Sequence, residues 1–506
     1  MLVENPQQTT NEAESQSMAS SSPEDTFVRA LEKEPPKAFT KIGSKLYAAS
    51  LIGCFCATMD GYNGSLINNL LANKNFLDCY GGSNSGLWSG LVTAMYQIGA
   101  VAAFPFVGPA VDTWGRRAGM IIASILTIVG AVVQGAGTNI QSFMGGSFLL
   151  GFGISIAVTA GPTFTGSIIA AGAARGALDI GGNGSWRIII WLQVLFAGII
   201  VVVALFLPES PRWLYVNSKQ TAATEMLIKF HGDGNPDSEW VKLQLNEYEE
   251  YLELDGADKR WWDYRALFRN KASIYRLYCN VCISIFAQWM GNAVITYFMS
   301  AVLDTAGYKG TVAQHNLILI NNCQGFAWSI LGASLVDKFG RRPLLLFSNI
   351  GCSLAWVGMT VATSKFANEQ NQAAGQAALG MLFIFNAIYA VGITPLQALY
   401  PVEVLSFEMR AKGMAFSSLA TGAAGLLNKF AWPVSIERIA WRTYIIFAVW
   451  DAIQAIVIYF TIVETKNRTL EELDEIFKAP NPVMASIKRK KSVAGVFPNS
   501  LEALIP

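Results

Sequence analysis

Two short charged cassettes in this chain combine the residue types needed for ion pairs between helix ends. Residues 112–117 read Asp-Thr-Trp-Gly-Arg-Arg, and residues 337–342 repeat the pattern as Asp-Lys-Phe-Gly-Arg-Arg, an offset of 225 (337 − 112). Guanidinium groups form charge-assisted, often bidentate hydrogen bonds with carboxylates. Such bonds can join two helix ends in one packing and release them in another. The predicted gating set is Asp112, Arg116, Arg117, Glu209, Arg212, Asp337, Arg341, Arg342, Glu403, Arg410 and Glu464.

A simpler interpretation is that the arginines only orient the chain in a membrane, since positive charge is retained on the cytosolic side. Orientation requires positive charge, but it does not require the accompanying Asp and Glu residues. The cassettes therefore favour a gating role over a purely topological one.

Long apolar runs flank both cassettes and predict the elements that position them. A helix needs about 20 apolar residues to cross a bilayer. The first six are expected near 46–71, 87–110, 118–137, 142–163, 166–182 and 186–207. Six more are expected near 275–300, 315–335, 343–362, 377–400, 413–433 and 441–462. Apolar blocks with a charged turn at the same place in both halves are typical of a duplicated membrane protein.

The chain divides into five predicted parts. These are a disordered cytosolic tail at 1–44, a six-helix bundle at 45–207, a cytosolic helical connector at 208–273, a second six-helix bundle at 274–463, and a cytosolic C-terminal tail at 464–506. With six spans in each bundle, the basic clusters at 116–117, 341–342 and 488–491 all face the cytosol. Both termini are therefore expected on that side.

Composition supports a membrane protein and argues against other classes. Only 14% of the residues are charged and 52% are hydrophobic, whereas a soluble domain has about a quarter charged residues. A net charge of +1 predicts no nucleic-acid partner. Six of the seven cysteines lie in apolar runs, and the chain has only two histidines. We therefore expect no metal, no cofactor and no enzymatic activity, because no nucleophile–base set or phosphate loop is present either.

Six signatures follow one another between residues 45 and 477. They are Gly108-x-x-x-Asp112-x-x-Gly115-Arg116-Arg117, Pro208-Glu209-Ser210-Pro211-Arg212, Gln288-Trp289-Met290-Gly291-Asn292, the cassette from Asp337 to Arg342, Tyr400-Pro401-x-Glu403 with Arg410-Ala411-Lys412-Gly413, and Glu464-Thr465-Lys466 with Thr469-Leu470-Glu471-Glu472. In this order they resemble the sugar porter family of the major facilitator superfamily. The nearest resemblance is to its fungal branch of lactose permease-like and hexose transporters. The resemblance implies an all-α, twelve-helix fold and transport of a sugar by alternating access.

Neutral amides and an aromatic ring on bundle-facing helices are the expected sugar-binding groups. An amide offers both a donor and an acceptor to a sugar hydroxyl. Gln288 and Asn292 would share one face of a continuous seventh helix at i and i+4, and by the resemblance this helix binds sugar. The predicted substrate-binding set is Gln288, Asn292, Tyr297, Asn322 and Asn428. The alternative is that these amides bond helix to helix.

One departure from the family concerns protons. Proton-coupled members carry Gly-Tyr-Asp on the first helix and an Arg early in the fourth, where this chain has Asn63 and Ser147. Losing both charges is electrostatically balanced and removes the usual proton site. Asp60 stands one turn before Asn63, and an intramembrane carboxylate is a functional candidate. Asp60 is thus the candidate coupling residue, with facilitated diffusion and proton symport both open.

Two further departures alter the expected site. Arg117 to Pro208 is 91 residues (208 − 117) and Arg342 to Glu464 is 122 (464 − 342), although each interval must hold four spans. The first half therefore lacks roughly 25 to 30 residues, in the hairpin between its fourth and fifth helices. Ala398 replaces a family Trp on the tenth helix, which leaves room for a larger substrate such as a disaccharide.

The sequence thus predicts a multi-pass plasma-membrane carrier for a hexose or for a disaccharide such as lactose. Its expected partners are the sugar, protons in the case of symport, and the lipid bilayer, and we expect a monomer. Two alternatives stay open, a non-transporting nutrient receptor and a transport-inactive relative. The short C-terminal tail argues against the first, and the shortened hairpin is the main argument for the second.

Overall fold

The computed structural model describes residues 33–34, 41–157, 163–232, 234–255, 265–406, 409–468 and 470–487. Most of the predicted N-terminal tail and the basic run at 488–491 lie outside these residues. Two tail residues that are described contact the connector. Lys33 Nζ lies 2.9 Å from Glu239 Oε1, and Glu34 accepts a hydrogen bond from Ser238 Oγ. The predicted tail is therefore ordered at these two residues, because a carboxylate and a hydroxyl of the connector bind them.

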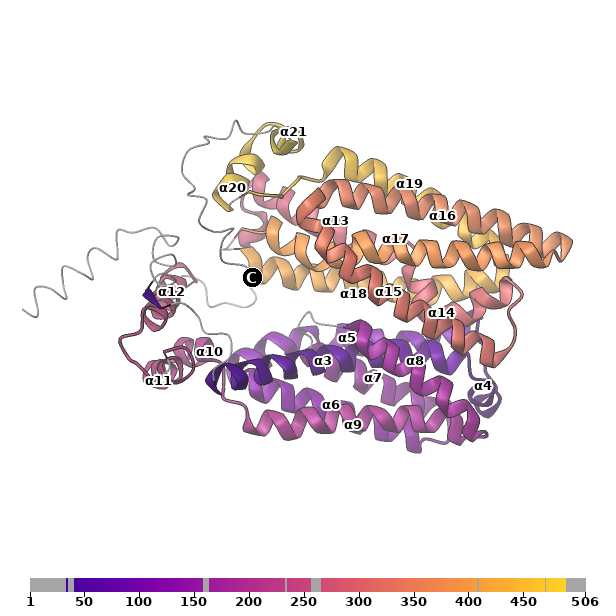
Figure 1. Cartoon of the computed structure of the whole chain (residues 1–506), viewed down its shortest axis with the longest axis horizontal. Coiled ribbons are helices and arrows are strands. Elements are labelled where there is room, and N and C mark those ends of the chain that lie inside the picture. The colour runs from indigo at the N-terminus through magenta and orange to yellow at the C-terminus, as the bar shows by residue number, and fades with distance from the viewer. Residues whose placement is uncertain are drawn as a thin grey trace, which may run out of the picture.

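The described residues form two halves, each with six long helical segments lying side by side (Figure 1). The first half contains α3 (Lys41–Leu71), α5 (Gly86–Trp114), α6 (Arg116–Ala136), α7 (Ile140–Ala157), α8 (Thr163–Ala177) and α9 (Gly184–Phe206). The second contains α13 (Lys271–Trp289) with α14 (Asn292–Thr305), then α15 (Thr311–Phe339), α16 (Arg341–Glu369), α17 (Gln372–Val404), α18 (Arg410–Ile439) and α19 (Thr443–Thr461). The predicted twelve-helix architecture is confirmed.

Apolar composition and outward-facing side chains mark these helices as membrane spans. Six described stretches are long and apolar enough to cross a membrane: Arg116–Ala136, Gly184–Phe206, Lys271–Thr305, Arg341–Glu369, Gln372–Val404 and Lys412–Thr461, the last of which includes both α18 and α19. Large apolar side chains such as Phe206, Leu354 and Phe460 are exposed. Polar ones such as Gln193 and Thr127 are buried instead. Apolar side chains on the outside suit contact with lipid, and buried polar side chains suit hydrogen bonds between helices.

Short helices gather at the two ends of the bundles. The connector forms α10 (Pro211–Val216), α11 (Gln220–Phe230) and α12 (Glu239–Asp255), at the same end as α20 (Leu470–Lys478) and α21 (Pro482–Ile487). At the opposite end, α4 (Lys74–Tyr80) joins α3 to α5 (Figure 1). The predicted C-terminal tail is therefore partly folded. Buried Arg276 of α13 pairs with Asp474 of α20, and its guanidinium lies 4.4 Å from the Phe477 ring.

Within the described residues, the closest helix contacts between the two halves are those of α5 with α18, α8 with α15, and α3 with α14. The α5–α18 pair is tight at Gly90, where an added Cβ would lie 2.8 Å from the carbonyl oxygen of Lys429. A glycine is needed at this point because any side chain would push the helices apart. The halves thus meet through main-chain contact in the middle of the molecule.

The hairpin between the fourth and fifth spans is short in the first half. Helices α7 and α8 have 18 and 15 described residues, whereas their counterparts α17 and α18 have 33 and 30. The helix predicted at 166–182 ends earlier than expected, because α8 ends at Ala177 and a 3₁₀ turn, Leu178–Ile180, follows it. Residues 158–162 between α7 and α8 lie outside the described part.

Candidate functional site

A carboxylate caps the helix that begins inside the first cassette. Glu209 Oε1 accepts hydrogen bonds from the backbone N–H groups of Arg116 at 2.9 Å and Arg117 at 3.3 Å. These are the first residues of α6, whose N-terminus carries unpaired N–H groups and a partial positive charge. Gly115 has φ +93°, and a Cβ there would lie 2.4 Å from Glu209 Oε2. The glycine of the cassette is what lets the carboxylate approach.

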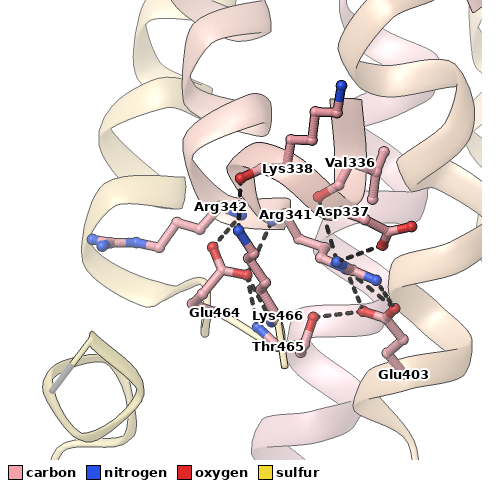
Figure 2. A network of polar contacts seen from close by, with 9 residues as sticks. All are labelled: Val336, Asp337, Lys338, Arg341, Arg342, Glu403, Glu464, Thr465 and Lys466. Atoms are coloured by element: carbon pink, nitrogen blue, oxygen red, sulfur yellow. Dashed lines mark hydrogen bonds and ion pairs between the residues drawn. The ribbon is translucent and has the colours of Figure 1, made fainter. Parts of the chain in front are cut away.

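The second cassette repeats this cap with different residues (Figure 2). Glu464 Oε1 accepts from the backbone N–H of Arg341, and Oε2 accepts from that of Arg342, both at 3.0 Å. Gly340 has φ +95°, and a Cβ there would lie 2.8 Å from Glu464 Oε2. The second arginine of each cassette also binds the end of a neighbouring helix. Arg117 Nη2 donates to the carbonyl of Leu205, and Arg342 Nη2 donates to that of Tyr459, both at 2.5 Å.

An additional ion pair in the second half ties α16 to the end of α17. Arg341 Nη2 donates to Glu403 Oε1 at 2.6 Å, and Nε donates to Oε2 at 3.0 Å, so the contact is bidentate. Asp337 Oδ1 lies 3.2 Å from Arg341 Nη1, and Thr465 Oγ1 donates to Glu403 Oε2 at 2.5 Å (Figure 2). Bidentate arginine–carboxylate pairs fix both distance and orientation. We call this contact the Arg341–Glu403 pair.

Of the remaining predicted gating residues, the structure describes the surroundings of Arg410 but not the side chains of Asp112 and Arg212. A pocket of about 410 Å³ lies beside the Arg341–Glu403 pair, lined by Arg341, Val402, Glu403, Arg410, Thr465, Asn467, Arg468 and Leu473. The hydrogen bonds given above run within one half each, to backbone groups as well as to side chains. The links that we predicted between the inner ends of the two halves stay a prediction.

The seventh span is split between two of its predicted binding residues, so the shared face expected for Gln288 and Asn292 is wrong. Helix α13 ends at Trp289, and α14 begins at Asn292. Gly291 has φ +97° and turns the chain, and the ring of Trp356 occupies the space that its side chain would need, 2.5 Å from an added Cβ. Trp356 Nε1 donates to the freed carbonyl of Met290 at 2.9 Å. The break is therefore stabilised by a neighbouring helix, which the local sequence alone did not reveal.

Two predicted binding amides bond helix to helix in this structure. Asn428 Nδ2 donates to the main-chain oxygen of Gln288 at 2.7 Å, and Asn428 Oδ1 accepts from Trp432 Nε1 at 2.7 Å. Asn322 Nδ2 donates across the two halves to the carbonyl of Ser167 on α8 at 3.2 Å. These contacts fit the alternative that we gave for them. Their part in substrate binding stays a prediction.

Tyr297 lies in a group of polar and aromatic residues that the sequence analysis did not identify. Its ring is 4.2 Å from Lys429 Nζ, and this lysine is only 1% exposed. Lys429 Nζ also donates to Gln97 Oε1 at 3.1 Å. Asp60, the candidate coupling residue, accepts a hydrogen bond from Tyr96 Oη at 3.0 Å. A charged residue in the apolar run 413–433 was the signal that could have found Lys429.

The two positions at which the resemblance expects charges, Asn63 and Ser147, are neutral. Ser147 Oγ accepts from Gln134 Nε2 of α6 at 2.7 Å. Asn63 is buried, and within the described residues neither amide atom has a hydrogen-bond partner. Ala398 is exposed on α17. The described residues also contain no group of three or more His, Cys, Asp or Glu side chains that could hold a metal.

Comparison with a solved structure shows the fold. The chain superposes on the proton:xylose symporter XylE bound to 6-bromo-6-deoxy-D-glucose with a TM-score of 0.68, 19% sequence identity, and coverage of 86% of this chain and 99% of that one. At this identity the likeness shows the fold alone. The fold is the major facilitator fold.

The family described as Sugar (and other) transporter matches residues 49–178 and 162–477. This chain therefore belongs to that family, and it is a multi-pass membrane protein. The two matched segments overlap at 162–178, so the match is interrupted at the short α7–α8 hairpin.

Two curated relatives are similar over most of their length. A high-affinity glucose transporter of Kluyveromyces lactis is 26% identical, over 85% of this chain and 85% of the relative. A quinate permease of Emericella nidulans is 24% identical, over 89% of this chain and 92% of the relative.

Proposed function

We propose that this protein carries a sugar across the plasma membrane by alternating access between its two halves. The observation that carries the proposal is the paired device at the cassettes, where Glu209 and Glu464 cap equivalent helices of the two repeats. Family membership and the likeness to a glucose transporter support sugar as the substrate class. A hexose or a disaccharide such as lactose fits the expected site.

The cassettes and the Arg341–Glu403 pair are proposed to switch between two packings at the inner face. Each capped helix end is held by hydrogen bonds to an ionised carboxylate, which are stronger than neutral ones. The halves can then move as rigid bodies, because the inner helix ends of each half are tied to one another. Alternating access requires such rigid-body movement around a central site.

The broken seventh span is proposed to be part of that central site. Split helices place main-chain carbonyls and helix ends beside a substrate in many transporters. Here Gln288 lies in the last turn of one half-helix, and Asn292 begins the next. Together with Tyr297, Asn322 and Asn428 they form the proposed sugar site. A sugar that hydrogen-bonds to Asn428 or Asn322 would have to replace a helix–helix contact.

The connector, α20 and α21 lie at one end of the bundles, and the positive-inside rule places this end in the cytosol. Both termini are then cytosolic. We propose that the protein acts as a monomer in the bilayer, because each sugar site would lie within one chain. Asp60 is the proposed proton-coupling residue if transport is a symport.

Uptake of labelled glucose, galactose and lactose in yeast that lacks its own sugar carriers tests the proposal. Saturable uptake of one sugar is expected, and accumulation that a protonophore abolishes would identify symport. Gln288→Leu should reduce this uptake, whereas the exposed Gln376→Leu at the start of α17 is the matched control. Absence of uptake by protein that reaches the cell surface would contradict the proposal and favour a receptor or an inactive relative.

A further inference from the structure

Lys429 is a buried cation that the proposed sugar site does not use. It lies in α18, 10 residues before Ile439 (439 − 429), while Tyr96 lies 10 residues after the start of α5 (96 − 86) and Asp60 lies 11 before the end of α3 (71 − 60). These helix ends are on one side, because Gly86 lies against Glu437. At 1.5 Å per residue each of the three lies about 15 Å along its own helix from that end, which is inside a membrane core of about 30 Å.

The contacts of Lys429 cross from the second half to the first. Its ammonium donates to Gln97 Oε1 on α5 at 3.1 Å and lies 5.3 Å from the ring of Tyr96 on the same helix. On its own side it lies 4.2 Å from the ring of Tyr297 on α14. An ammonium over an aromatic face is attracted by the ring electrons. One neutral amide and two rings hold this cation, but none of them balances its charge.

Asp60 carries the opposite charge that interacts with Lys429, and Tyr96 lies between the two. The carboxylate of Asp60 accepts a hydrogen bond from Tyr96 Oη at 3.0 Å, and Asp60 and Lys429 attract one another electrostatically. Tyr96 therefore contacts both members, one by its hydroxyl and the other by its ring face. An isolated charge in a membrane interior is costly, and a paired one is less so.

The other titratable groups near this pair are the phenols of Tyr96 and Tyr297. Among the described residues, α19 and α17, which also pack against α18, carry Asp451 and Tyr389. The electrostatic interactions of Asp451 are with Cys352 and with Tyr389, all in the interior of the second half. Asp60 is thus the carboxylate that interacts with Lys429.

We propose that Asp60 and Lys429 form a proton-coupling pair between the two halves, bridged by Tyr96, in place of the pair that Asn63 and Ser147 no longer provide. The inference rests on the proposed transport function. A proton adds to a carboxylate oxygen of Asp60 from the outer side and leaves it on the inner side. Neutral Asp60 on α3 no longer attracts Lys429 on α18, so the two halves separate more easily. Lys429 acts through Asp60 and is a positioning residue, and Tyr297 moves with it as its remaining partner.

Transport by the purified full-length protein in liposomes tests the coupling. With an inward proton gradient, the wild-type protein should accumulate labelled glucose, galactose or lactose above equilibrium. Lys429→Gln and Asp60→Asn should each lose accumulation. The uncharged double variant should exchange sugar faster than either single variant and still not accumulate it. Lys365→Gln, an exposed lysine of α16, is the control and should accumulate sugar normally. Accumulation by Lys429→Gln at the wild-type level would overturn the proposal.

A second measurement needs no substrate. Each single substitution should lower the midpoint of thermal unfolding in detergent, and the double variant should lose less than the sum of the two. Additive losses would overturn the pair. Coupled losses without exchange of any of the three sugars would support the pair and contradict only the proposed transport of these sugars. Quinate exchange that is lost in Lys429→Gln but kept in Asp60→Asn would overturn the proposal, because Lys429 would then bind a substrate carboxylate.

Discussion

The two halves share one device and differ in another. In both, a carboxylate caps a helix that follows a glycine with positive φ, with Glu209 on α6 and Glu464 on α16. Only the second half, as described, adds a bidentate ion pair, between Arg341 and Glu403 at the end of α17. The carboxylate cap, which needs only the cassette and a nearby glutamate, is present in both halves. The Arg341–Glu403 pair lies in the half with the longer hairpin.

The difference in hairpin length is large on the scale of a membrane. From the start of α7 to the end of α8 the chain has 38 residues (177 − 140 + 1), and from the start of α17 to the end of α18 it has 68 (439 − 372 + 1). The difference of 30 residues (68 − 38), shared between two helices, is about 22 Å of each. Glu403 and Arg410, which stand where the long hairpin turns, have no counterpart among the described residues of α7 and α8. Among the described residues, the bidentate ion pair at the inner face is therefore found in the second half.

The largest predicted difference is between Arg341→Gln and Arg116→Gln. Arg341 is buried in its ion pair, and removing it leaves the Glu403 carboxylate without its main partner. We expect a loss of about 3 kcal/mol, seen as a lower midpoint of thermal unfolding, together with loss of sugar uptake. Arg116 contributes its backbone N–H to the cap and has an exposed side chain, so Arg116→Gln should cost below about 0.5 kcal/mol. Equal effects of the two substitutions would show that the halves do not differ in this way.

A matched pair of glycine substitutions tests the device that the halves share. Gly115→Ala and Gly340→Ala both place a Cβ against the capping carboxylate at a left-handed φ. Each should cost about 1–3 kcal/mol of stability, by a similar amount in the two halves. The control is Gly172→Ala in α8, where a Cβ would meet nothing within 4 Å and should do no harm. If only one of the two cassette substitutions lowered stability, the carboxylate cap would be important in that half alone.

The smallest effect is expected at a further difference, the seventh span. Its counterpart α3 is continuous over 31 residues, whereas the seventh span is split at Gly291. Trp356→Phe keeps a ring beside Gly291 but removes the hydrogen bond to the carbonyl of Met290, at a cost of about 1 kcal/mol. Trp328→Phe at an exposed site of α15 is the control. If both variants unfolded at the same temperature, the hydrogen bond from Trp356 to the Met290 carbonyl would not stabilise the break.

Sequence patterns predicted the twelve helices, the short hairpin and the charged residues at the cassettes, because hydropathy and charge are local properties. They did not predict how the charges pair. Glu209 and Glu464 bind backbone N–H groups, a geometry set by the φ of Gly115 and Gly340. The break after Trp289 depends on Trp356, 65 residues beyond Gly291 (356 − 291), so no local pattern contained it. Lys429 was missed because the expected sugar-binding groups are neutral amides and aromatic rings, and a lysine is neither.

Counterflow tests the central claim, transport of a sugar by alternating access, most directly. Liposomes with the purified protein would be loaded with unlabelled glucose, galactose or lactose and then diluted into a trace of the same labelled sugar. A carrier exchanges one sugar for the other through a single moving site, so the account predicts a transient excess of label inside for one of the three. Correctly inserted protein that gives no excess with any of them would contradict the account.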